Sequence, residues 1–104
     1  MNVFLLAAML LVSGPASTAN ATVTVHIKDS AYVPSVISVA PGTVVRFVND
    51  DTQAHTVTAV NNSFDSTGLN AGEAWAYRFS KPGTYAYYCV LHTNIRGKIV
   101  VRNP

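Results

Sequence analysis

Short segments of alternating apolar and polar residues run through most of the chain. The clearest is 22–28, in which Val23, Val25 and Ile27 alternate with threonine, histidine and lysine. Alternation with a period of two is typical of a strand that buries one face. Further segments with the composition of strands are 36–39, 43–48, 55–60, 74–79, 85–89 and 97–101.

Turn residues separate these segments, and no part of 22–104 shows a sustained helical period. Pro41-Gly42, Asn49-Asp50-Asp51 and Lys81-Pro82-Gly83 each stand between two predicted strands. Short strands at roughly even spacing, joined by such turns, favour an all-β sandwich or a small barrel. The length of 104 residues predicts a single domain.

The N-terminal segment has a different character. Residues 1–12 carry no charged side chain and are apolar except for Asn2, and they are too few to span a bilayer as a helix, which takes ~20 residues. Gly14-Pro15 follows, and Ala19 and Ala21 form an A-x-A pair. This pattern predicts a signal peptide over 1–21, a mature domain over 22–104 and a periplasmic or otherwise exported protein. Because the start lacks lysine and arginine, an uncleaved anchor or a buried strand is the alternative.

Charge and cysteine content narrow the class of protein. Seven basic and five acidic residues give a net charge of +2, and the basic residues are scattered rather than clustered. We therefore expect no nucleic-acid partner. We also expect no stable membrane insertion and a monomer. The single cysteine cannot form an internal disulfide, so the core alone, a metal or pairing between molecules must stabilise so small a domain.

Three residues could supply the ligands of a metal. Cys89 ends a predicted strand on the same face as Tyr85 and Tyr87, and His92 follows in a loop. His55 opens another predicted strand. Strands distant in sequence end side by side in a sandwich, so the three side chains can meet. Two imidazoles and one thiolate suit copper in an electron-transfer site, usually with a weak axial thioether, whereas zinc is the competing metal.

An enzymatic role is disfavoured by what surrounds this cluster. We expect no carboxylate beside it to act as a general base, since Asp65 and Glu73 fall in or beside the long loop 61–72. A cysteine protease needs an exposed thiol next to a base, and Cys89 is predicted to face inward. His26 lies on the polar face of the first strand, where we expect it to be solvated and uninvolved.

Six short motifs follow one another in a specific order along 25–101. They are V-x-I-x-D-x-x-Y-x-P, A-P-G-T-V-V-R-F-V-N-D-D, A-H-T-V, F-D-S, K-P-G-T-Y-A-Y-Y-C and H-x-x-x-R-G-K-I-V-V. In this order the motifs resemble the cupredoxins, the small blue copper proteins, and are nearest to the plastocyanin and amicyanin branch. The resemblance implies a Greek-key β-sandwich of about seven to eight strands. It also implies that His55, Cys89 and His92 are the equatorial ligands of one type 1 copper ion that alternates between Cu(I) and Cu(II).

The chain departs from the family pattern at three positions. Ile95 stands where the family usually has the axial methionine, Thr56 where asparagine is common, and Val90 where serine or threonine is common. Without a thioether, Cu(II) is disfavoured, so we expect a raised reduction potential. In relatives the other two side chains tie the ligand loops together. Because valine has no polar side-chain atom, we expect this tie to be lost and the site to be looser.

The resemblance thus implies an exported protein, not an enzyme, that shuttles single electrons. We expect a redox partner protein to dock transiently near His92, on an apolar patch of Val90, Leu91 and Ile95. Two alternatives stay open. One is a copper-binding module for storage, delivery or sensing without fast electron transfer, and the other is a metal-free structural β-sandwich.

Overall fold

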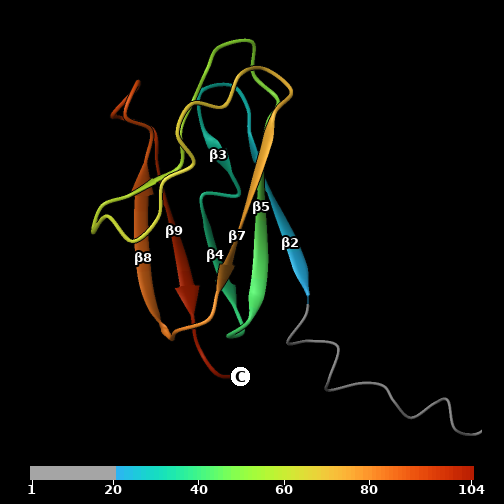
Figure 1. The fold of residues 1–104 in the computed structure, drawn as a ribbon, viewed down its shortest axis with the longest axis vertical. Coiled ribbons are helices and arrows are strands. Elements are labelled where there is room, and N and C mark those ends of the chain that lie inside the picture. Colours follow the sequence, from blue (N-terminus) through green and yellow to red (C-terminus); the bar gives the residue numbers. More distant parts are fainter. Residues whose placement is uncertain (1–20) are drawn as a thin grey trace, which may run out of the picture.

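The computed structural model describes residues 21–104, which form two four-stranded β-sheets packed face to face (Figure 1). The first sheet has the order β3 (Tyr32–Val33), β2 (Thr22–Ile27), β5 (Thr43–Asn49), β7 (Ala74–Phe79). The second has the order β4 (Val36–Val39), β9 (Arg96–Val101), β8 (Gly83–Tyr88), β6 (Thr58–Ala59). This arrangement of eight strands confirms the predicted all-β sandwich.

The N-terminal prediction lies almost wholly outside this part of the chain. Apart from Ala21, the predicted signal peptide 1–21 falls outside the described residues. Among the residues that are described, no helix is long and apolar enough to cross a membrane.

The strands agree closely with the alternating segments, with two differences. The predicted strand 55–60 is a strand only at Thr58–Ala59, because the chain around Leu69 pairs with its first residue instead. His55 and Leu69 exchange both backbone hydrogen bonds, at 3.0 and 2.8 Å. The second difference is β3, whose two residues are too few to show a period in the sequence.

The core lies between the sheets and is rich in aromatic rings. Phe64, which comes from the long loop, packs its ring 5.0 Å from that of Tyr77 and 5.3 Å from that of Phe79. It thereby closes the space between the edge of β7 and the second sheet. Tyr87 packs against Gly97 on the neighbouring strand, where an added Cβ would lie 2.5 Å from the tyrosine hydroxyl oxygen. Position 97 therefore has no room for a side chain.

Two loops meet at one end of this sandwich. β5 ends at Asn49 and β8 ends at Tyr88, and both strands end toward the top of Figure 1. The turn after β5 is held by the buried amide of Asn49, which donates to the carbonyls of Gln53 and Leu69, each at 2.8 Å. The sheets thus fix the starting points of the loops that follow each strand.

Candidate metal centre

The three predicted ligand residues lie together where these loops meet. The Sγ of Cys89 is 3.7 Å from Nδ1 of His55 and 3.8 Å from Nδ1 of His92. The donor atoms all lie within 4.8 Å of one another. His55 and Cys89 are fully buried, whereas His92 is partly exposed. Within residues 21–104, no other group of three or more His, Cys, Asp or Glu side chains is arranged to hold a metal.

The spacing of these atoms fits one transition-metal ion. A thiolate ~2.3 Å and an imidazole ~2.0–2.1 Å from the same ion, about 120° apart, lie roughly 3.8 Å from each other. Both observed sulfur-to-nitrogen separations are close to this value. One soft thiolate and two imidazoles suit copper, and zinc accepts the same three donors with water as a fourth. The site therefore fits the metal that the sequence implied.

The loop between Cys89 and Ile95 is closed by its own backbone. The N–H of Cys89 donates to the carbonyl of Ile95 at 3.1 Å, and the N–H of Ile95 donates to the carbonyl of His92 at 2.9 Å. These bonds turn His92 back toward Cys89. They also bury Ile95, which is only 3% exposed and packs in the core. Ile95 is therefore wrongly included in the predicted apolar surface patch.

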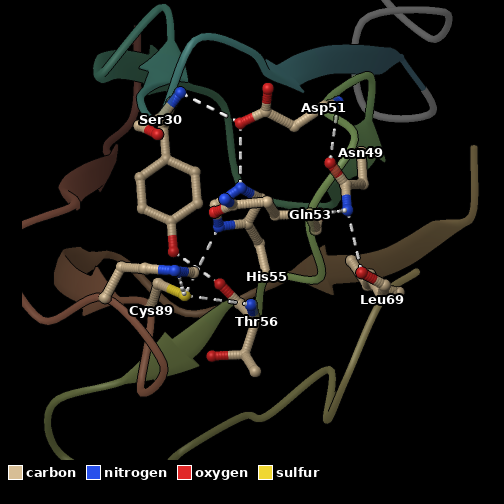
Figure 2. A network of polar contacts seen from close by, with 10 residues as sticks. Ser30, Asn49, Asp51, Gln53, His55, Thr56, Leu69 and Cys89 are labelled. Atoms are coloured by element: carbon tan, nitrogen blue, oxygen red, sulfur yellow. Dashed lines mark hydrogen bonds and ion pairs between the residues drawn. The ribbon is translucent and has the colours of Figure 1, made fainter. Parts of the chain in front are cut away.

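A carboxylate lies against the far side of one imidazole, contrary to the prediction that none adjoins the cluster. Asp51 Oδ2 is 2.9 Å from Nε2 of His55 and accepts the backbone N–H of Ser30 at 3.0 Å (Figure 2). The bond from Ser30, followed by that from His55, holds the pKa of the Asp51 carboxyl below its usual range. An ionised carboxylate only accepts hydrogen bonds, so Nε2 of His55 carries the proton. Nδ1, which lies on the Cys89 side of the ring, would then offer its lone pair to a metal ion shared with the Cys89 sulfur.

Thr56 links the two loops that carry the donors. Its backbone N–H donates to Sγ of Cys89 at 3.3 Å, and its Oγ1 accepts the backbone N–H of Val90 at 3.0 Å. The hydroxyl of Tyr32 donates to its carbonyl at 2.5 Å. The predicted loss of the tie between the ligand loops is therefore wrong. Val90 has no polar side-chain atom, but its main-chain N–H donates to Thr56 in place of a side chain.

His26 takes no part in the cluster, as predicted, and its side chain is half exposed. Its Nδ1 lies 2.5 Å from Oδ2 of Asp50, in the same turn that carries Asp51. Asp50 and Asp51 thus each face a different histidine. Only the second of these pairs involves a member of the cluster.

Comparison with known proteins gives a consistent picture. A family model described as a cupredoxin-like domain matches residues 2–101. Amicyanin from Paracoccus versutus is 27% identical over 84 residues, which cover 76% of this chain and 64% of that protein. The chain thus spans less than two thirds of the length of this relative.

Two solved structures are similar in fold. A purple cupredoxin from Nitrosopumilus maritimus superposes with a TM-score of 0.72 at 28% identity, covering 77% of this chain and 99% of that one. A Cu-containing nitrite reductase from Thermus scotoductus SA-01 gives a TM-score of 0.75 at 30% identity, covering 80% of this chain and 23% of that one. This chain therefore corresponds to one part of a longer enzyme and to the whole of a small protein.

Proposed function

The chain belongs to the cupredoxin family, and we propose that it is an exported copper protein that carries single electrons. His55, Cys89 and His92 would be the ligands of one copper ion. The observation that carries the proposal is the meeting of one thiol and two imidazole nitrogens within 4.8 Å. When bound, copper supplies a one-electron couple between Cu(I) and Cu(II).

The protein's own groups hold these donors in place. Cys89 is fully buried, and the Thr56 N–H donates to its sulfur at 3.3 Å, which fixes the direction in which the sulfur points. Asp51 fixes the ring of His55 from behind. Because the loops start from two hydrogen-bonded sheets, the donor atoms can keep their separations when the charge at the site changes. A rigid site of this kind suits electron transfer.

His92 is the route by which a partner would approach. It is the only one of the three proposed ligands that is partly exposed. Beside it in sequence, Val90 is 45% and Leu91 is 56% exposed. A small apolar patch around an accessible ring suits a brief encounter with a redox partner protein.

A second candidate is a copper-binding module for storage, delivery or sensing, and Ile95 favours it. At the position where the resemblance expects a methionine, this side chain offers no donor atom. We propose no catalytic activity for the domain, since the similarity to the nitrite reductase covers only 23% of that enzyme.

The test is to add Cu(II) to the purified protein and to record its visible spectrum and its redox cycle. Electron transfer predicts an intense thiolate-to-copper band, reversible cycling, and loss of the band in Cys89→Ser. Tight uptake without cycling would favour the copper-binding module, and no uptake would contradict both. For export, the N-terminus of the secreted protein is expected to be Thr22.

A further inference from the structure

The outer face of the second sheet carries a stripe of positive charge along β9. Arg96, Lys98 and Arg102 are exposed, and they alternate with Ile99 and Val101, which are 0% and 2% exposed. Six residues of extended chain place the two arginines ~20 Å apart. The three cations therefore form a line on one side of one strand and its immediate extension.

These cations have no acidic partner within the described residues. The ion pairs found in residues 21–104 are those of His26 with Asp50 and of His55 with Asp51. Arg96 instead places its guanidinium 5.5 Å from the centre of the Tyr88 ring. The stripe thus faces solvent with its charge uncompensated.

The strands on either side of the stripe add apolar and uncharged surface. Lys98 lies opposite Val36 of β4 and Ala86 of β8. Val36 is 58% exposed, and Val60, whose N–H donates to the carbonyl of Ala86 at 2.9 Å, is 54% exposed. These two valines lie on opposite sides of the stripe. Arginine, tyrosine and exposed aliphatic groups on one surface are typical of protein interfaces.

None of the five acidic side chains lies on β9 or on the strands that pair with it. Asp65 is at the β6 edge, where Oδ1 accepts from Thr58 Oγ1 at 3.0 Å and from the Thr67 N–H at 2.9 Å. The other four belong to the first sheet's turns and loops, namely Asp29, Asp50, Asp51 and Glu73. Three of the seven basic residues therefore share a strand and its extension that carry no acidic side chain, although the net charge is only +2.

We propose that this surface, which we call the β9 face and define by Val36, Val60, Tyr88, Arg96, Lys98 and Arg102, docks an acidic surface of a protein partner. The inference rests on the proposed function, because β8 leads directly into Cys89 and β9 follows directly after Ile95. A partner at His92 can therefore extend along these strands, which lie side by side in Figure 1.

Charge decides between the possible occupants. A second copy bound through the same face would set like charges against one another, which costs free energy. A lipid surface would gain little apolar burial from two valine side chains, because interfacial membrane-binding segments insert larger residues such as Trp, Phe and Leu. An acidic protein surface compensates the three cations and covers the valines as well.

The test uses isotope-labelled protein and an oligoglutamate peptide as the probe, followed by NMR at low salt. As peptide is added, we expect saturable chemical-shift changes of the backbone amides in β4, β8 and β9. These changes should become smaller as salt rises from ~10 to ~150 mM. Lys98→Glu/Arg102→Glu is expected to weaken peptide binding at least about tenfold. The matched control Arg46→Glu/Lys81→Glu changes the net charge equally, on residues outside the β9 face, and is expected to retain binding.

Several results would overturn the proposal. The first is an equal loss of peptide affinity in both double variants. The others are chemical-shift changes confined to residues outside β4, β8 and β9, and no chemical-shift change at low salt. Binding to phosphatidylserine vesicles but not to the peptide would assign the face to lipid instead. Copper uptake is measured in parallel. Failure of the native protein to take up copper would contradict the proposed function, whereas loss of peptide binding alone in the β9 variant supports docking.

Discussion

The side-chain hydroxyl of Thr56 accepts the backbone N–H of Val90 at 3.0 Å. Thr56 directly follows His55, and Val90 directly follows Cys89, so one hydrogen bond fixes the spacing of two donor-bearing loops. The same hydroxyl lies 2.9 Å from that of Thr58, on β6. Both loops are thus connected to the second sheet.

Replacing Thr56 with valine is expected to loosen this connection. The change keeps the shape of the side chain but leaves the Val90 N–H without its acceptor, which costs about 1 kcal/mol in the free energy of unfolding. Metal affinity is expected to fall about 10–100-fold, as for other outer-shell partners. Urea unfolding of the metal-free protein and a competition titration measure the two effects. Thr56→Ser keeps the hydroxyl and serves as the control; if both variants behave alike, the hydroxyl does not hold the loops.

The sequence predicts the scaffold and the donors better than it predicts what holds the donors. Strict alternation marks strands such as 22–27, and histidine and cysteine are so few that His55, Cys89 and His92 are easily chosen. Asp51 was missed because its contact depends on the turn that the Asn49 amide folds, and no periodic pattern marks such a turn. A signal did exist: a carboxylate four residues before a candidate ligand histidine, directly after a strand.

The Thr56 bond shows a further limit of sequence reasoning. A side chain that bonds to another residue's main chain leaves no mark on the identity of that residue. Any non-proline residue at Val90 offers the same N–H. The predicted strand 55–60 failed for a related reason, because the pairing of His55 with Leu69 depends on how the long loop returns.

Asp51→Asn is expected to weaken metal binding about 10–100-fold, because the neutral amide is a poorer acceptor for the His55 ring and for Ser30. A competition titration with a Cu(I) chelator measures the affinity. Asp50→Asn is the matched control, since the Asp50 carboxylate contacts His26, which lies outside the cluster. An equal loss of metal affinity in both variants would show that only the overall negative charge of the turn matters.

Tyr32 and Tyr87 are both buried, and their ring centroids are 4.6 Å apart, yet loss of the hydroxyl is expected to affect stability differently at the two positions. The hydroxyl of Tyr32 donates to the Thr56 carbonyl, so Tyr32→Phe is expected to lower the free energy of unfolding by about 1–3 kcal/mol. The Tyr87 hydroxyl is buried and has no hydrogen-bond partner in the described part of the chain. Tyr87→Phe is therefore expected to be neutral or stabilising. Urea unfolding measures the free energy of unfolding of both variants. If Tyr87→Phe loses more stability than Tyr32→Phe, the prediction is contradicted.

Ile95→Met is expected to lower the reduction potential of the copper-loaded protein. Ile95 closes the ligand loop through its main chain, and this bond to Cys89 does not depend on its side chain. A thioether there would offer electron density that favours Cu(II), whereas isoleucine offers none. Because the swap nearly conserves volume, the cost in stability should stay below about 1.5 kcal/mol. Voltammetry compares this variant with Ile95→Leu, which changes the shape of the side chain without adding a donor and should leave the potential near the native value. If the methionine variant has the same potential as the leucine variant or a higher one, position 95 does not control the potential through a missing donor.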